Sequence, residues 1–139
     1  MSHDKTLLSK IGRRLQQSKG YVFLRKDFDD LSGYDQVGRS LRELVTQGKL
    51  IKIGYGLYAK TKKSSLTGQV VPMAPLPTLA KEALARLGIK TSPSRLEEDY
   101  QAGRTTHVPT GRLIAITGRV RRKIGYNGML VHFERPAGK

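Results

Sequence analysis

YDQVGRSLRELVTQGKLIKIGYGLYAK, residues 34–60, carries a helix pattern followed by a hairpin pattern, and this order decides the fold. Apolar residues recur at the i, i+4, i+7 and i+8 spacing of one helix face: Val37, Leu41, Leu44 and Val45. The other face is polar and contains Asp35, Gln36, Arg39, Arg42, Glu43 and Thr46. The spacing therefore predicts an amphipathic helix over 34–47, with Gln36 and Arg39 nearest its start.

This helix has a start signal and a stop signal in the sequence. Ser32 is the expected N-cap, with Asp35 three residues later in a short variant of the capping box. Gly48 supplies the positive φ at which helices end. Two strand-like runs and a glycine-rich reversal with Tyr55 at its tip follow: 50–53, 57–60 and Gly54-Tyr55-Gly56. We therefore predict a β-hairpin directly after the helix.

The preceding residues supply further short elements. A helical stripe predicts a helix from about Asp4 to Ser18, a β-prone run follows at 21–24, and a brief helix is expected over 25–31. None of these pieces is large enough to bury its own apolar face. Together they predict an α+β protein whose residues 1–60 form a winged helix-turn-helix DNA-binding domain.

Composition narrows the class of protein. The chain has 139 residues, no cysteine and a formal net charge of +15. Residues 1–60 carry 12 Lys/Arg against 6 Asp/Glu, and residues 61–139 carry 14 against 5, so both halves are basic. Such an excess of positive charge favours binding to polyanions, because phosphates that the protein neutralises release their counterions. Neither disulfides nor thiolate metal sites are possible, and without a secretory signal or a membrane span we expect a cytoplasmic protein.

The second half is predicted to be a separate small domain. Residues 61–77 read as a linker, basic and Ser/Thr-rich at first and ending with three prolines, and 78–139 read as a small basic α+β domain. We expect a helix over Thr78–Leu87 and a second, capped by Ser94 with Glu97, reaching Gln101. Strand candidates are 113–117, 120–124 and 129–133, with Asn127-Gly128 as a two-residue hairpin turn.

A basic stripe is predicted within this second domain. On a strand over 120–124, the side chains of Arg119, Arg121 and Lys123 would share one face while Val120 and Ile124 point inward. Three interpretations stay open: a second phosphate-binding surface, a patch for an acidic protein partner, or a charged edge that prevents aggregation.

No catalytic or metal-binding pattern stands out, so we expect neither an enzyme nor a cofactor. His3, His107 and His132 are scattered without the spacing of metal ligands. Asp27, Asp29 and Asp30 lie at a short helix whose first turn favours acids, which is a better interpretation than a metal site, and they could equally repel DNA or pair with Arg25 and Lys26. Glu97, Glu98 and Asp99 are consecutive and do not face one another across a cleft, so they do not suggest a pair of catalytic carboxylates.

The residues expected to contact DNA lie in the helix, the hairpin and the start of the linker: Tyr34, Asp35, Gln36, Arg39, Ser40, Arg42, Lys49, Lys52, Tyr55, Lys60, Lys62 and Lys63. Arg39 suits a bidentate contact with guanine and Gln36 one with adenine. Ser40 and Arg42 are assigned to base edges or phosphate, and Tyr34 to the core or to phosphate.

The hairpin residues have a different expected role. Lys49, Lys52, Lys60 and Tyr55 would meet the DNA backbone or the minor groove and set register without reading sequence. For Lys62 and Lys63, phosphate contact and simple solvation are equally good interpretations.

The sequence resembles the AbiEi-type antitoxins, which are bacterial winged-helix regulators encoded beside a nucleotidyltransferase-like toxin. The motifs that carry the resemblance are Gly20-Tyr21-Val22-Phe23, Asp27-Phe28, Tyr34-Asp35-Gln36-Val37, Arg39-Ser40-Leu41, Leu44, Gly48-Lys49-Leu50, Gly54 to Lys60, Ala80 to Leu84, Leu87-Gly88 and Thr105 to Gly111. The resemblance implies a transcriptional repressor that binds operator DNA near its own promoter and counters a toxin that is its genetic partner.

Two other classes of function remain beside a DNA-binding regulator. A structured-RNA binder would expose stacking aromatic residues, for which Tyr55, Tyr126 and Tyr100 are the candidates. A basic adaptor would bind an acidic protein in a salt-tolerant way and would not bind duplex. No membrane partner is expected, since the sequence has no long basic amphipathic helix. Both a dimer and separate monomers on an inverted repeat fit the sequence.

Overall fold

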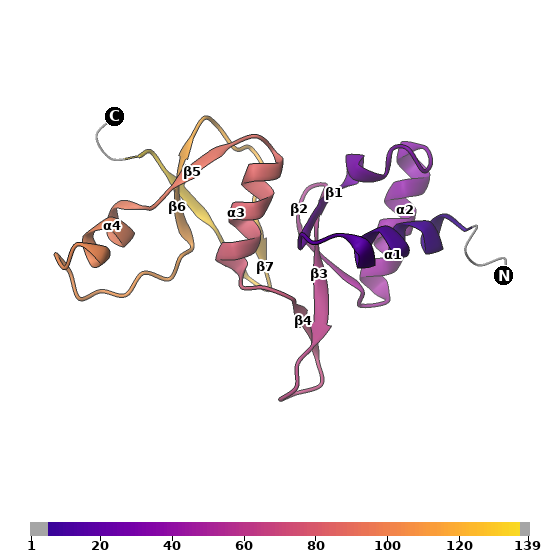
Figure 1. The fold of residues 1–139 in the computed structure, drawn as a ribbon, viewed down its shortest axis with the longest axis horizontal. Helices are drawn as coiled ribbons and strands as arrows, with labels where there is room; N and C mark the ends of the chain where they lie inside the picture. Colours follow the sequence, from indigo (N-terminus) through magenta and orange to yellow (C-terminus); the bar gives the residue numbers. More distant parts are fainter. Residues whose placement is uncertain (1–5, 137–139) are drawn as a thin grey trace. The chain divides into compact units, whose positions relative to one another are not determined.

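A computed structural model describes residues 6–136 of the chain. The chain divides into two compact units, residues 1–74 and 75–139, and both are mixtures of helices and strands. An α+β fold is therefore confirmed, and the two units are described separately below (Figure 1).

Unit 1 contains three helical segments and four strands. Their bounds are α1 Leu7–Gln17, β1 Val22–Leu24, the 3₁₀-helix η2 Arg25–Phe28, α2 Tyr34–Thr46, β2 Leu50–Gly54, β3 Leu57–Lys63 and β4 Val70–Pro72. The order matches the predicted one, although the brief helix expected over 25–31 is only a four-residue 3₁₀ turn. The side chain of Thr6 caps α1 by accepting from the Ser9 amide, and the predicted start of this helix at Asp4 lies outside the described residues.

The sheet of unit 1 is organised around β3. Strands β1 and β2 pair with it on opposite sides, both antiparallel, and β4 pairs with its second half. In Figure 1, α1 and α2 lie together beside this sheet. The core between helices and sheet contains Ile11, Phe28, Val37 and Leu41, all fully buried, and α2 therefore turns its predicted apolar stripe inward.

Residues 61–72, within the predicted linker, are folded as part of unit 1. Thr61, Lys62 and Lys63 extend β3, and they pair with Pro72, Val71 and Val70 of β4. The boundary between the two units in the sequence lies between Ala74 and Pro75. Composition favoured a linker here because Ser, Thr, Gly and Pro dominate the segment, but its backbone is hydrogen-bonded in a hairpin, with the Ser64 amide donating to Gln69.

Unit 2 contains a three-stranded sheet, a two-stranded hairpin and two helices. Their bounds are α3 Leu76–Arg86, β5 Lys90–Ser92, α4 Arg95–Gln101, β6 Leu113–Thr117, β7 Gly125–Tyr126, β8 Met129–Leu130 and β9 His132–Glu134. Strand β6 is central, antiparallel to β5 and parallel to β9. Helix α3 buries Leu79, Ala80, Ala83 and Leu84.

Several details of unit 2 follow the sequence and others correct it. The capping box of Ser94 and Glu97 is present, and Asn127 and Gly128 both have positive φ in the β7–β8 turn, as predicted. Helix α3 begins at Leu76, two residues before the predicted start, because Pro77 is tolerated in the first helical turn. The strand predicted over 120–124 is absent, and the run 129–133 is split between β8 and β9.

Candidate nucleic-acid interface

Helix α2 exposes the polar face that the sequence predicted. Tyr34, Asp35, Gln36, Arg39 and Arg42 are exposed, and Ser40 is half-buried. The opposite face buries the apolar stripe together with Gly38. A contiguous set of hydrogen-bonding side chains thus covers the first two turns of α2, where the helix start would meet a ligand.

The start of α2 differs from the predicted cap. Gly33 is the N-cap and makes no side-chain cap hydrogen bond. The hydroxyl of Ser32 instead donates to Gln36 Oε1 at 2.6 Å. Ser32 therefore holds the Gln36 amide in place, and a bidentate contact by Gln36 requires its oxygen to accept a second hydrogen bond, which an amide oxygen can do.

The end of α2 follows the prediction. Gly48 has φ +79, its amide donates to Val45, and the Lys49 amide donates back to Leu44 at 2.9 Å. This pair of bonds is a Schellman motif, in which glycine adopts the left-handed conformation without strain. The motif turns the chain directly from the helix into β2.

Arg25 of η2 is packed against the first turns of α2, and sequence reasoning did not include it among the site residues. Its guanidinium carbon lies 3.4 Å from the centre of the Tyr34 ring, and Nη2 donates to the Tyr34 carbonyl at 2.7 Å. A Cβ added to Gly38 would come 2.1 Å from Nη2, so the guanidinium occupies the space above this glycine. The interior glycine of an otherwise good helix was the available signal for this contact.

The same residues join α2 to the β2–β3 hairpin. The Tyr34 and Tyr55 hydroxyl oxygens are 3.4 Å apart, and the Arg25 amide donates to the Gly56 carbonyl at 3.2 Å. The hydrogen bond with Tyr55 is the main cause that raises the pKa of Tyr34 above its ordinary value. Tyr34 and Tyr55 are 57% and 68% exposed. Helix start and hairpin tip therefore form one continuous exposed surface, not two separate ones.

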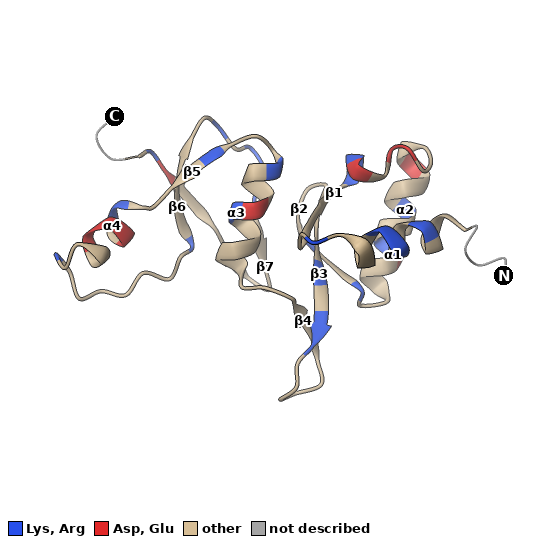
Figure 2. Cartoon of the chain, viewed as in Figure 1, with Lys and Arg blue, Asp and Glu red and all other residues tan. Residues whose placement is uncertain are grey.

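The predicted lysine contacts are spread over unit 1. Lys52 belongs to this surface, with its ammonium 6.0 Å from the centre of the Tyr55 ring. Lys49 follows the C-terminal end of α2, which is about 20 Å from the start of this 13-residue helix. Lys60 donates to the Ser18 carbonyl at 2.6 Å, and Lys62 and Lys63 are exposed on the β3–β4 ribbon. Figure 2 shows these basic positions along β3 and others on α1.

Within the acidic cluster at η2, Asp30 pairs with a residue that the sequence did not indicate. Asp30 forms a salt bridge with Arg14 at 2.7 Å, not with Arg25 or Lys26. Arg14 also donates to the Asp27 carbonyl at 2.8 Å, and an Asp27 carboxylate oxygen accepts from the Leu24 amide. These acids tie α1 and β1 to η2.

The basic stripe of unit 2 is exposed but is not on a strand. Arg119, Arg121 and Lys123 are exposed and Ile124 is fully buried, so the predicted alternation of exposure is present in an irregular segment. Arg119 and Arg121 line a hollow of about 350 Å³ with Arg135, which sequence reasoning missed. Arg135 is fixed there by donating to the Gly118 carbonyl at 2.8 Å.

Within residues 6–136, no three His, Asp or Glu side chains are grouped so that they could hold a metal ion. His3 lies outside these residues. No helix in the same part of the chain combines the length and the apolar character that crossing a membrane requires.

Comparisons with known proteins give one match. Neither the curated proteins nor the solved structures include a match to the chain. A protein family described as a family of unknown function, DUF6088, matches residues 10–139. Because this match covers nearly the whole sequence, the chain belongs to the DUF6088 family.

Proposed function

We propose that unit 1 is a winged helix-turn-helix domain that binds duplex DNA as a transcriptional regulator. In this proposal α2 enters the major groove and the β2–β3 hairpin is the wing. The single observation that carries the proposal is the Tyr34–Tyr55 contact, because it places the polar start of α2 and the exposed hairpin tip on one surface. A helix that reads bases beside a hairpin that contacts backbone is the geometry such domains use.

The side chains on this surface divide into two roles. Arg39 and Gln36 are exposed on the first two turns of α2 and present the donors and acceptors that suit guanine and adenine edges. Arg42 and Ser40 lie further along the helix and are assigned to base edge or phosphate. Asp35, in the first turn of the same helix, would repel phosphate and would accept a hydrogen bond from a cytosine amino group.

Phosphate contacts are assigned to Tyr34, Tyr55 and Lys52. The Tyr34 hydroxyl at the start of α2, the Tyr55 hydroxyl at the hairpin tip and the Lys52 ammonium can all donate to phosphate oxygens. Lys62 and Lys63 add charge along the ribbon, and Arg119, Arg121 and Arg135 give unit 2 a second phosphate-binding surface. Lys60, held by Ser18, is not needed for this assignment.

The net charge of +15 supports a polyanionic partner in a second, independent way. Each phosphate contact should steepen the salt dependence of binding by a slope of about 0.9 on logarithmic scales. Charge alone does not distinguish DNA from RNA or from an acidic protein. The α2 surface supports DNA over RNA, because it presents a helix rather than a sheet of stacking aromatic residues.

An autoregulating antitoxin is the more specific form of the proposal, and its support is the sequence resemblance. In this form of the proposal the operator lies in the DNA upstream of the protein's own gene, and the genetic partner is a nucleotidyltransferase-like toxin. Co-expression of the adjacent reading frame tests this form: growth arrest that this protein relieves is expected, and a harmless neighbour would contradict the antitoxin role.

The DNA-binding proposal is tested by gel-shift titration of the full chain against its own upstream duplex. Scrambled duplex and transcript RNA are the competitors, and each titration is made at two salt concentrations. Saturable binding that survives both competitors is expected. Equal, strongly salt-dependent binding to every nucleic acid would overturn the proposal of sequence recognition. Preferential competition by the transcript would favour an RNA-binding protein. Absence of binding to any of the nucleic acids would favour the basic adaptor.

A further inference from the structure

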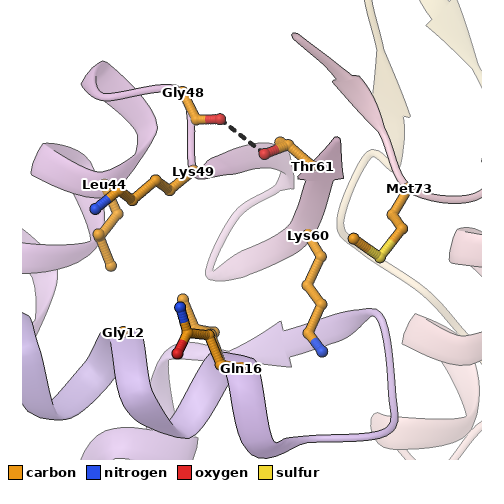
Figure 3. A pocket seen from close by; sticks show the side chains of 9 residues that line it. Gly12, Gln16, Leu44, Gly48, Lys49, Lys60, Thr61 and Met73 are labelled. Atoms are coloured by element: carbon orange, nitrogen blue, oxygen red, sulfur yellow. Dashed lines mark hydrogen bonds between the residues drawn. The ribbon is translucent and has the colours of Figure 1, made fainter. Parts of the chain in front are cut away.

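A pocket of about 440 Å³ opens in unit 1 at the end of α2 opposite to the proposed DNA surface (Figure 3). Three elements contribute its walls: α1 with Gly12, Leu15 and Gln16, the end of α2 with Leu44, and β3 with Lys60 and Thr61; Gly48, Lys49 and Met73 complete it. This volume is within the range of about 300–1,000 Å³ that small-molecule sites occupy. The pocket lies wholly within residues 12–73, so it belongs to a single unit.

The polar part of the pocket is cationic. Lys60 and Lys49 are two of the nine lining residues, and none of the nine is acidic. The Lys60 ammonium donates one hydrogen to the Ser18 carbonyl and lies 5.8 Å from the centre of the Phe23 ring, and an ammonium has three hydrogens to donate. In Figure 3 the Gln16 amide and Lys60 come from the facing elements α1 and β3.

The other part of the pocket is apolar. Leu15 and Leu44 belong to the core of unit 1 and form its inner wall, and the exposed thioether of Met73 borders it. The Thr61 hydroxyl is occupied by its hydrogen bond to the Gly48 carbonyl at 2.7 Å. A ligand that fits must therefore combine an anionic group with an apolar body, and methionine adapts easily to the shape of such a body.

Gly12 gives independent evidence that this space is kept open. It lies inside α1, where glycine weakens a helix relative to alanine. A Cβ built on Gly12 meets no atom within 4 Å, so alanine would fit without displacing any part of the protein. Gly38 is a contrasting case, because the Arg25 guanidinium fills the space above it. Packing accounts for Gly38, whereas a ligand that uses the pocket would account for Gly12.

We propose that this pocket binds a small organic carboxylate with an apolar tail, its carboxylate on Lys60 and its tail against Leu15, Leu44 and Met73. The site is distinct from the α2 start and the hairpin tip, and binding there does not depend on whether the protein binds DNA.

Sodium octanoate is the probe, titrated into the full chain by isothermal titration calorimetry and by ¹H–¹⁵N NMR spectroscopy. Acetate, which has the charge without the tail, and octylamine, which has the tail with the opposite charge, are the matched ligands. Octanoate is expected to bind saturably at one site and to shift the amide resonances of Gly12, Gln16 and Lys60. Acetate and octylamine are expected to bind at least tenfold more weakly, since each retains only half of the recognition.

Two substitutions test separately the contributions of the Lys60 charge and of the open space beside Gly12 to octanoate binding. Lys60→Met removes the ammonium and keeps the stem, and Gly12→Leu fills the opening. Each is expected to weaken octanoate binding about tenfold or more: Lys60→Met because a charge-assisted hydrogen bond is lost, and Gly12→Leu because the leucine side chain occupies the space of the ligand. Lys63→Met, on the same strand but outside the pocket, is the matched control and should bind octanoate normally.

Gly12→Ala serves as a second space-filling variant in case Gly12→Leu fails to fold, and it should weaken binding by a smaller factor. Equal binding of octanoate, acetate and octylamine would overturn the proposal. So would normal octanoate binding by folded Lys60→Met, or shifts at amides remote from the pocket.

Discussion

The guanidinium of Arg25 lies so close to Gly38 that any side chain at position 38 would displace it. The missing Cβ would be 2.1 Å from Nη2, and the displaced atom is the end of a flexible side chain. A larger residue at 38 is therefore accommodated by movement of Arg25 away from Tyr34, not by movement of α2. Gly38 thus determines whether the contact between Arg25 and Tyr34 exists.

Alanine at the two helical glycines should have different effects on stability. Gly12→Ala gains helix propensity in open space and should raise the free energy of unfolding by about 0.8–1.0 kcal/mol. Gly38→Ala gains the same propensity but loses the Arg25 hydrogen bond to Tyr34, so its free energy of unfolding should be about 1–3 kcal/mol lower than that of Gly12→Ala. Hydrogen exchange of the buried α2 amides measures both values. Equal gains would show that the Arg25 contact contributes nothing.

Tyr55→Phe should weaken binding to duplex without unfolding the protein. The substitution removes one exposed hydroxyl together with its 3.4 Å contact to Tyr34, so the melting temperature is expected to fall only slightly. Affinity should fall roughly two- to tenfold, the effect of one hydrogen bond of about 0.5–1.5 kcal/mol. Fluorescence anisotropy with labelled upstream duplex provides the measurement. Tyr126→Phe, in the β7–β8 hairpin of unit 2, is the matched control.

Arg39→Ala and Lys52→Ala should weaken binding in different ways. Loss of Arg39 is expected to reduce discrimination between operator and scrambled duplex by about 1–3 kcal/mol, because a bidentate base contact is lost. Loss of Lys52 should weaken both duplexes alike and reduce the salt slope by about 1. Affinities measured over a salt series on both duplexes separate the two effects. A uniform loss in Arg39→Ala would remove it from the base-reading role.

Acid should abolish the contribution of the Arg14–Asp30 pair. The hydrogen bond from Arg14 is the main cause that lowers the pKa of Asp30 below 3.8. A carboxylate with a lowered pKa in the folded state stabilises the protein above the unfolded value, and this stabilisation is lost as pH falls through the folded value.

Asp30→Asn should therefore lower the melting temperature slightly at neutral pH, since exposed ion pairs are screened by water. The difference from the unsubstituted protein should disappear as pH falls below 3.8. Thermal denaturation at about pH 7, 5 and 3 tests this, with the exposed Asp29→Asn as control. A difference that persists undiminished at acid pH would mean that Asp30 acts through packing and not through its charge.

The capping box of α4 should contribute measurably to unit 2. Ser94 is 1% exposed, and its hydroxyl accepts from the Glu97 amide at 3.1 Å while Glu97 accepts from the Ser94 amide. Ser94→Ala is expected to cost about 1 kcal/mol, and Ser94→Gly only a few tenths. Urea denaturation followed by the helical circular dichroism signal compares the variants. An unaffected Ser94→Ala would show that α4 is held by its other contacts.

The sequence predicted the parts of the fold that depend on local periodicity. The apolar stripe of α2, its end at Gly48 and the Asn127-Gly128 turn each follow from residues within one helical turn or one hairpin, and each was confirmed. The expected N-cap at Ser32 was wrong because the Ser32 hydroxyl bonds a side chain, Gln36, rather than the helix backbone.

Features that depend on distant partners were missed. The β4 strand exists only because β3 is long enough to pair with it, and residues 64–69 look like a linker until that pairing is known. The segment 120–124 has the predicted alternation of exposure without forming a strand, and its Ile124 carbonyl accepts a hydrogen bond from the Val131 amide. Arg25 belongs to the candidate site because it contacts the ring and the carbonyl of Tyr34, nine residues away, and lies over Gly38, thirteen residues away. None of these contacts has a signature in local spacing.

The position of β1 at the edge of the sheet constrains how unit 1 folds. Within residues 6–136 its three buried residues pair with β3 alone, and Val22 pairs with Ala59 across 37 residues of chain. By contrast, α2, β2 and β3 are consecutive and contact one another locally. Closing the longer loop costs more entropy, and contacts of high sequence separation slow folding. We therefore expect φ-value analysis to place the contacts of α2, β2 and β3 in the transition state and those of β1 after it.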